Sequence, residues 1–166
     1  VIEANWLFNV DYDDIQVLVH PQSVVHSMVE YGDGSVLAHL GKADMRIPIQ
    51  YALTWPERQA NPFPKLDFTQ IAGLEFFAPD FEKFPALKLA YEVGRVGKSA
   101  PAVLNGANEI AVAAFLKEQI GFMDIPALVQ WVVDSHTPVE IENFAHLLEI
   151  DNWARAKAQE FVQSRA

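Results

Sequence analysis

The sequence predicts an α+β fold, in which a small sheet built on a β-hairpin precedes an all-α C-terminal bundle of four-helix type. Two patterns indicate this order. Residues 15–41 are rich in valine and are interrupted by turn residues, which is typical of short strands. From residue 81 onward, apolar residues recur every three or four positions, which is typical of amphipathic helices. Between these regions, residues 55–85 hold five of the ten prolines.

The hairpin is predicted from two β-rich runs that flank a short loop with the sequence GDG. The runs are residues 23–31 and 35–41. Strict alternation along the first run places Val25 and Ser27 on one face and His26 on the other. Because neither face is purely apolar, we expect helices to cover one side of the sheet and a functional or subunit surface on the other.

Three shorter elements are predicted around this hairpin. Residues 1–9 have helical spacing and end at the turn cluster NVDYDD, and residues 15–20 form a β-rich run broken by the proline that follows. Residues 43–56 resemble a helix with Asp44 as its N-cap and a proline at its end.

Four helical tracts are predicted in the C-terminal half, separated by glycines and short polar connections. Short connections favour antiparallel neighbours, and therefore a helical bundle. Asp124 is the expected N-cap of the third tract, and Asp151 is a second candidate cap at which the fourth tract would divide. The tracts are residues 81–97, 100–121, 124–136 and 139–163.

The composition is that of a globular protein, with 51% hydrophobic and 20% charged residues. The net charge of −10 argues against a nucleic-acid partner, because binding to phosphates requires clustered Lys and Arg. The absence of cysteine excludes disulfides and thiolate metal sites, and fits a reducing compartment. No apolar run approaches the roughly 20 residues of a membrane-spanning helix, so no membrane partner is expected.

The N-terminal end begins with Val1 rather than Met, and its helical pattern starts without a capping residue. It also lacks the basic and apolar regions of a signal peptide. We therefore expect the chain to be cut from a longer protein, with a processed natural terminus as the alternative.

Two histidines and two serines lie within VLVHPQSVVHSMVEY, residues 17–31. As metal ligands, His20, His26 and His39 lack both the spacing of a known zinc site and an accompanying carboxylate. As a nucleophile and its base, Ser23 and His26 are three residues apart and would face opposite sides of a strand. We therefore favour a hydrogen-bonded His26 that supports a neighbouring site.

The run LNGANEIAVAAFL, residues 104–116, places Asn105, Asn108 and Glu109 at an expected helix beginning. There Asn would act as an N-cap and Glu would complement the helix dipole. The sequence contains no glycine-rich dinucleotide loop, no phosphate-binding P-loop and no H-E-x-x-H zinc motif. The residues alone therefore indicate no nucleotide site.

Several stretches occur in an order and at intervals that resemble the C-terminal portion of the 1-deoxy-D-xylulose 5-phosphate reductoisomerase family. The resemblance runs from Val1 almost to the end of the chain, and its most specific motifs are HPQS-x-x-HS and ANE-x-A-x-AAFL. The stretches are IEANWLFN, VHPQSVVHSMVEYGDGSVLAHLG, DMRIPIQYALTWPER, LDF, LEFFAPD and LNGANEIAVAAFL.

The resemblance implies an enzyme of the methylerythritol phosphate route to isoprenoids. Members of this family rearrange 1-deoxy-D-xylulose 5-phosphate, a phosphorylated sugar, and reduce it with NADPH to 2-C-methyl-D-erythritol 4-phosphate. They use Mg²⁺ or Mn²⁺ as a Lewis acid. They are homodimers joined through the sheet of the catalytic domain. The resemblance also implies a bacterial cytoplasmic location, with a plastid as the alternative.

By the same resemblance, residues 1–54 are a remnant of an α/β catalytic and dimerisation domain, 55–80 are a proline-rich linker, and 81–166 are the helical bundle domain. The NADPH domain and the metal-binding acidic residues of the family match no part of this sequence. We therefore expect the chain alone to bind neither cofactor nor metal and to be inactive. The alternative is a free-standing scaffold or dimerisation module without catalysis.

The resemblance implies supporting roles for four residues. His26 would lie beside the substrate pocket, with Ser23 in the same local network, and Met45 resembles a residue at the pocket wall. Glu3 follows the position of the family's metal-binding glutamate by one turn and would orient its surroundings. Loss of groups that support a metal site in this way commonly reduces activity about 10–100-fold.

Overall fold

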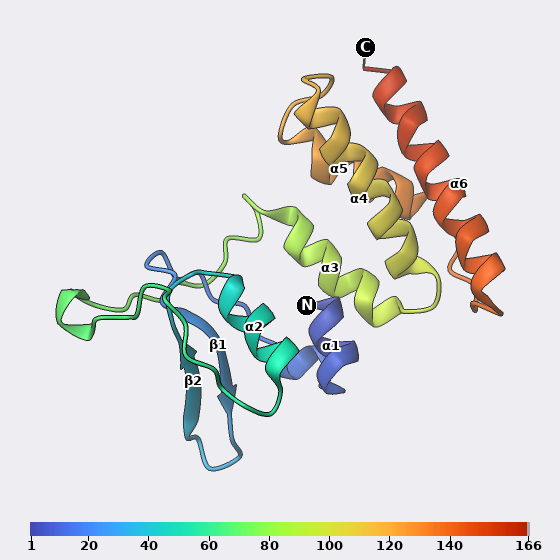
Figure 1. The fold of residues 1–166 in the computed structure, drawn as a ribbon. Coiled ribbons are helices and arrows are strands. Elements are labelled where there is room, and N and C mark those ends of the chain that lie inside the picture. Colours follow the sequence, from blue (N-terminus) through green and yellow to red (C-terminus); the bar gives the residue numbers. More distant parts are fainter. Residues whose placement is uncertain (166) are drawn as a thin grey trace. The chain divides into compact units, whose positions relative to one another are not determined.

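The computed structural model describes residues 1–165, which form two compact units (Figure 1). One unit combines Val1–Val17 with the chain from Asp80 onward, and the other is Leu18–Pro79. The units are groups of residues that contact one another. The N-terminal helix falls in the same unit as the bundle, and most of the expected linker falls in the same unit as the hairpin. The division into domains 1–54, 55–80 and 81–166 stays a prediction about the family's domain boundaries.

The first unit is helical and contains the four expected tracts, together with the N-terminal helix and one 3₁₀ turn. Helix α4 packs against α3, α5 and α6 (Figure 1). The mixture of these helices with the hairpin confirms the α+β fold class. The elements are α1 (Ile2–Phe8), η1 (Tyr12–Asp14), α3 (Pro85–Val96), α4 (Ala100–Leu116), α5 (Asp124–Asp134) and α6 (Phe144–Gln163).

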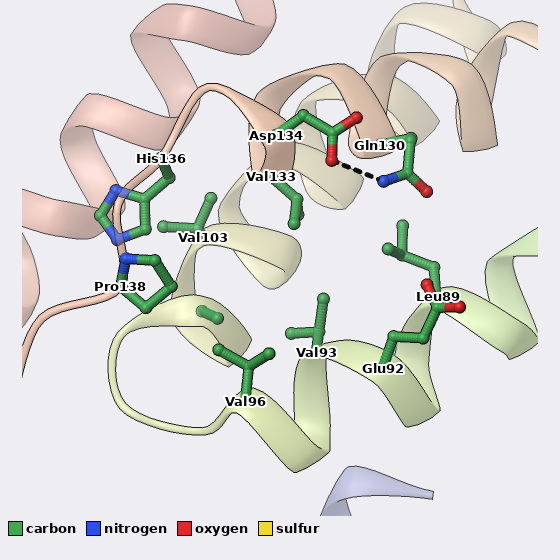
Figure 2. A pocket seen from close by; sticks show the side chains of 11 residues that line it. Leu89, Glu92, Val93, Val96, Val103, Gln130, Val133, Asp134, His136 and Pro138 are labelled. Carbon is green, nitrogen blue, oxygen red and sulfur yellow. Dashed lines mark hydrogen bonds between the residues drawn. The ribbon is translucent and has the colours of Figure 1, made fainter.

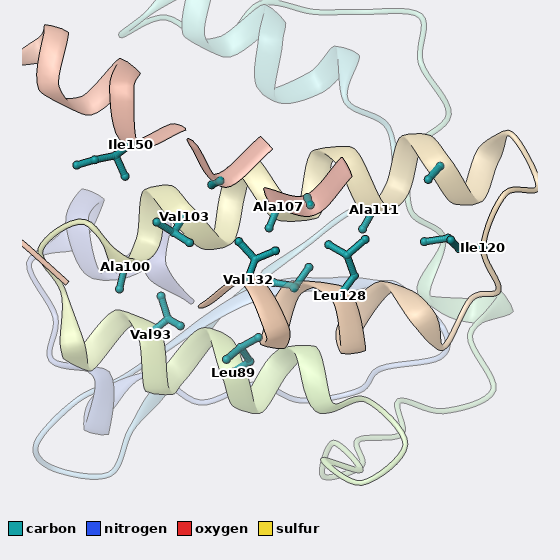
Figure 3. Close-up of a cluster of buried hydrophobic side chains, with 14 residues drawn as sticks. Leu89, Val93, Ala100, Val103, Ala107, Ala111, Ile120, Leu128, Val132 and Ile150 are labelled. Atoms are coloured by element: carbon teal, nitrogen blue, oxygen red, sulfur yellow. The ribbon is translucent and has the colours of Figure 1, made fainter. Parts of the chain in front are cut away.

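The core of this unit is built mainly from small side chains on α4 and α6, against which larger ones from α3 and α5 pack (Figure 3). Val103 and Leu128 are fully buried, and burial of such side chains stabilises a fold by about 1.5–3 kcal/mol each. Gly106 lets α6 approach closely, because a Cβ atom there would lie 2.9 Å from the Asp151 carboxylate. The core lines one face of each helix, as the apolar spacing predicts.

Two expected helix caps in this helical unit are wrong. Asp151 does not divide the last tract, because α6 is continuous and the Asp151 carboxylate accepts a hydrogen bond from Arg155 Nε at 2.6 Å, one turn further on. Met123, not Asp124, is the N-cap of α5; the Asp124 carboxylate instead accepts from the backbone N–H of Gly121 in the preceding loop at 2.9 Å.

The predicted helix beginning at Asn105 is also wrong. Helix α4 begins at Ala100, so Asn105 and Glu109 lie in its interior, where the Asn105 amide donates to the Glu109 carboxylate at 3.0 Å. The same carboxylate pairs with Arg155 of α6 at 2.7 Å, and this hydrogen bond holds the pKa of Glu109 below its usual range. The ANE motif therefore joins two helices rather than capping one.

A buried serine and a histidine connect the start of α4 with the segment after α5. Ser99 is fully buried, and its hydroxyl oxygen lies 2.7 Å from His136 Nε2. The same oxygen accepts from the backbone N–H of Val139 at 2.9 Å. Because the described residues offer this hydroxyl hydrogen no other acceptor, we assign it to His136, whose Nε2 is then the acceptor. Burial lowers the pKa of His136.

We expect His136 to make the protein less stable in mild acid. Its folded pKa lies below the unfolded value of about 6.5, so the unfolded chain takes up the proton first as pH falls. The stabilisation is fully present above the unfolded pKa and is lost as pH falls through the folded pKa. Urea unfolding at several pH values between about 7.5 and 5.5, on either side of the unfolded pKa, should show a steeper decline for the wild type than for His136→Gln. Parallel declines would contradict this assignment.

The second unit contains the predicted hairpin, one helix and a 3₁₀ turn. The strands β1 (Val25–Glu30) and β2 (Val36–Leu40) form a two-stranded antiparallel sheet, which confirms the hairpin. Both faces are largely exposed, with Met28 at 40% and Val29 at 56%, so residues 18–79 do not supply the expected helical cover. The remaining elements are α2 (Arg46–Thr54) and η2 (Phe68–Gln70).

The β-rich run 15–20 is not a full strand. Its one ladder contact is an isolated antiparallel bridge between Val19 and Phe77, with both N–O distances at 2.9 Å. Helix α2 confirms the tract predicted at 43–56, although its N-cap is Met45 rather than Asp44. The Asp44 carboxylate still accepts from the backbone N–H of Arg46 at 3.0 Å.

Candidate functional site

The candidate site begins with the tight turn that leads into β1. The backbone N–H of Ser23 donates to the carbonyl of His20 at 3.1 Å and closes a turn over Pro21 and Gln22. Ser23 has a φ of 49°, in the left-handed region that non-glycine residues rarely adopt. Such conformations persist only where the surrounding structure holds them, and they are frequent at functional sites.

His26 occupies a β-bulge immediately after this turn. Val25 pairs with Leu40 and Ser27 pairs with His39, so His26 is an extra residue with no partner of its own on β2. Since neighbouring residues of β2 point to opposite faces, Val25 and Ser27 do so as well. The strict alternation predicted for this strand is therefore wrong at the bulge. Bulges re-aim side chains and are over-represented beside active sites.

The imidazole of His26 is anchored to the far end of β2. Its Nε2 lies 3.2 Å from the carbonyl oxygen of Gly41, and its ring centroid lies 5.7 Å from that of His39. Because a carbonyl oxygen only accepts, Nε2 carries the hydrogen and Nδ1 is left as an acceptor. The side chain is exposed, and within residues 1–165 no hydrogen bond joins it to Ser23. These contacts favour a supporting role over a nucleophile–base pair.

Met45 lies at the beginning of α2 in the same unit, with 71% of its surface exposed. Its neighbours fix the backbone on both sides. Arg46 Nη2 contacts the Asp44 carboxylate at 2.6 Å, and the guanidinium lies 4.2 Å above the ring centroid of Phe63. Hydrogen bonds from Arg46 hold the pKa of Asp44 below its usual range. The Met45 side chain is thus presented to solvent from an anchored helix start.

Glu3 lies in the first turn of α1, in the other compact unit, and is exposed. A carboxylate in a first turn complements the positive end of the helix dipole. Its expected role in orienting the surroundings of a metal-binding glutamate stays a prediction.

The described residues do not form a metal site. Within 1–165, no three His, Cys, Asp or Glu side chains converge on a point where a metal ion would bind. His20 and His26, two of the three histidines considered as ligands, each use one ring nitrogen on a backbone carbonyl. Every helix among these residues is too short or too polar to cross a lipid bilayer.

A cavity of about 200 Å³ lies within the helical unit, among α3, α4 and α5 (Figure 2). Its walls are mainly apolar side chains such as Val93, Val103 and Leu89. None of the four predicted site residues contributes to it. Its single drawn polar contact joins Gln130 to Asp134 of the same helix at 2.8 Å. We interpret this cavity as part of the bundle's packing.

The residues that hold the turn were not predicted in this role. His20 Nδ1 lies 2.8 Å from the carbonyl oxygen of Glu75, and its ring stacks on Phe76 at a centroid distance of 4.7 Å. The Gln22 amide donates to the Glu75 carboxylate at 2.6 Å. The one available signal was the short β-rich run LEFFAP, which is a suitable partner for the run that precedes the turn.

This α+β arrangement, a bulged hairpin together with a helical bundle, is the architecture of the family that comparisons with known proteins identify. A family model described as the DXP reductoisomerase C-terminal domain matches residues 40–157. The chain therefore belongs to the DXP reductoisomerase family. The match begins at the end of β2. The assignment of the turn and the bulge to this family therefore depends on comparison with individual relatives.

Those relatives cover nearly the whole chain. The 1-deoxy-D-xylulose 5-phosphate reductoisomerase of Desulforamulus reducens is 58% identical over 164 residues, which is 99% of this chain and 42% of that protein. The enzyme of the same name from Heliobacterium modesticaldum is 54% identical, and the match spans 98% of this chain and 41% of that protein. The chain thus spans about two-fifths of the curated relatives it matches.

Solved structures agree with this assignment. The reductoisomerase from Zymomonas mobilis in complex with NADPH is 49% identical, with a TM-score of 0.91 over 98% of this chain and 43% of that one. A DOX-P reductoisomerase in complex with NADPH, fosmidomycin and magnesium is 43% identical, with a TM-score of 0.91 over 97% of this chain and 42% of that one.

Proposed function

We propose that this chain is the C-terminal portion of an enzyme that converts 1-deoxy-D-xylulose 5-phosphate to 2-C-methyl-D-erythritol 4-phosphate with NADPH. The observation that carries the proposal is 58% identity to a reductoisomerase over 99% of the chain. The metal, Mg²⁺ or Mn²⁺, would polarise the substrate carbonyl when bound. We assign the binding of NADPH and the metal to residues outside this chain, since residues 1–165 hold no cluster of metal-ligating side chains and the sequence has no dinucleotide loop.

Within that enzyme, the contribution of this chain is positional. His26 lies at the bulge, and the hydrogen bond from its imidazole to the Gly41 carbonyl holds it there. The turn at Ser23, with its left-handed backbone conformation, leads the chain into the bulge. Both features would set one wall of the substrate pocket, with Met45 at its rim. Such groups act by holding neighbouring catalytic groups in place, and small displacements of that kind are costly to rate.

We extend the proposal to a homodimer in the bacterial cytoplasm. The support for a dimer is the hairpin, where Val29, Val36 and Leu37 are each at least half exposed. Exposed apolar strands of this kind pair with other chains unless they are covered. The support for the location is that the curated relatives come from bacteria.

The test is a chimera in which this chain replaces the matched 164 residues of the Desulforamulus reducens relative. We expect the chimera to oxidise NADPH only when 1-deoxy-D-xylulose 5-phosphate and Mg²⁺ are both present. The chain alone and the remaining part of the relative alone are the controls, and neither should turn over. A folded but inactive chimera would favour a scaffold without catalysis, and turnover by the chain alone would also refute the proposal.

A further inference from the structure

We infer that His20 is a positioning residue for the reductoisomerase site, acting through the turn that sets His26. The inference rests on the proposed function for its effect on catalysis, and on this chain's own contacts for its mechanism. His20 lies three residues before Ser23, at the first position of the turn. Its ring ties the first position of the turn to a segment 55 positions further along the chain.

The attachment has three components. His20 Nδ1 donates to the Glu75 carbonyl at 2.8 Å, while its ring stacks on Phe76 with an interplanar angle of 15°. The Gln22 side chain donates to the Glu75 carboxylate at 2.6 Å and accepts from the Glu75 backbone N–H at 3.2 Å. The bridge between Val19 and Phe77 completes the contact. Together they hold the turn against residues 75–77.

The turn is also held from its other side. The carbonyl of Val24 accepts from the backbone N–H of Gly41 at 3.0 Å, and Val24 is 8% exposed. Gly41 is the residue whose carbonyl binds His26. Ser23 therefore stays in its left-handed conformation between two fixed attachments, and His26 follows only two residues after Val24. Release of the attachment at His20 would relax the turn and move the bulge.

The tautomer of His20 identifies which ring atom matters. Since the Glu75 carbonyl can only accept, Nδ1 carries the hydrogen. The other nitrogen, Nε2, is buried and has no hydrogen-bond partner within residues 1–165. Buried groups of this kind are rare, and loss of an unpaired one costs no hydrogen bond. The positioning role of His20 therefore depends chiefly on Nδ1, which acts on the fold and not on substrate.

Two amide substitutions distinguish the role of Nδ1 from that of Nε2. The side-chain nitrogen that His20→Asn introduces can take the place of Nδ1, whereas the nitrogen that His20→Gln introduces reaches the position of Nε2 instead. In the active chimera we expect His20→Gln to lower kcat/KM about 10–100-fold, as for other lost supporting groups, and His20→Asn to restore most of it. Equal activities of the two variants, whether both high or both low, would overturn the inference.

A second measurement uses the 166-residue chain itself. In ¹H–¹⁵N spectra of the histidine rings, the His26 resonances should shift in His20→Gln and stay close to wild type in His20→Asn. A merely stabilising role would lower the unfolding midpoint of both variants and leave the His26 ring unmoved, which would overturn the inference. If the wild-type chimera were inactive, the proposed function would fail, and these spectra would still decide whether His20 positions His26.

Discussion

Replacing His26 with Ala in the chimera is expected to lower kcat/KM about 10–100-fold, with little change in stability. The side chain is exposed, so its truncation removes little buried surface. What is lost is the hydrogen bond from Nε2 to the Gly41 carbonyl, which fixes the imidazole at the bulge. Steady-state kinetics of NADPH oxidation measure the first effect, and urea unfolding measures the second.

Matched variants show which atom of His26 is required. His26→Gln places an amide N–H near the position of Nε2 and should recover part of the activity, whereas the shorter His26→Asn should not. His39→Ala removes the neighbouring ring, 5.7 Å away, but leaves the bond to Gly41, and serves as the control. Wild-type activity in His26→Ala would contradict a role for the bulge in this site.

Replacing Leu128 with Ala is expected to lower the free energy of unfolding by about 2–5 kcal/mol. Leu128 is 0% exposed and lies at the centre of the helical core, against the small side chains of α4 (Figure 3). Truncation would leave a cavity that the rigid helices α4 and α5 cannot close. Urea unfolding followed by circular dichroism measures the change.

The control for this prediction is Leu116→Ala. Leu116 ends α4 and is 74% exposed, so the same chemical change should alter the free energy of unfolding by no more than about 0.5 kcal/mol. Similar losses in the two variants would mean that the core is not organised around Leu128.

The helices were predictable because their signals are local. An apolar stripe repeats within each tract, and Pro101 in the first turn of α4 marks its beginning. The cap predictions failed where polar side chains found tertiary or neighbouring partners instead. Asp151 is an example, since its carboxylate binds Arg155 within a continuous helix.

The hairpin was predictable, but its bulge was not. A bulge is visible in a sequence only where it interrupts a regular alternation of apolar and polar residues. Both faces of this strand mix the two kinds, so strict alternation placed the residues around His26 on the wrong face. His26 itself entered the site through the family motif. His20 was considered only as a metal ligand because its partner is the backbone carbonyl of Glu75, and every residue type has such a carbonyl.

We propose above that these 166 residues supply the C-terminal part of a working reductoisomerase. The most direct test is the rate of NADPH oxidation by the chimera with the Desulforamulus reducens relative, measured with and without 1-deoxy-D-xylulose 5-phosphate. We expect a rate that depends on this substrate and on Mg²⁺, and that is absent from either part alone. A correctly folded chimera with no substrate-dependent rate would contradict it.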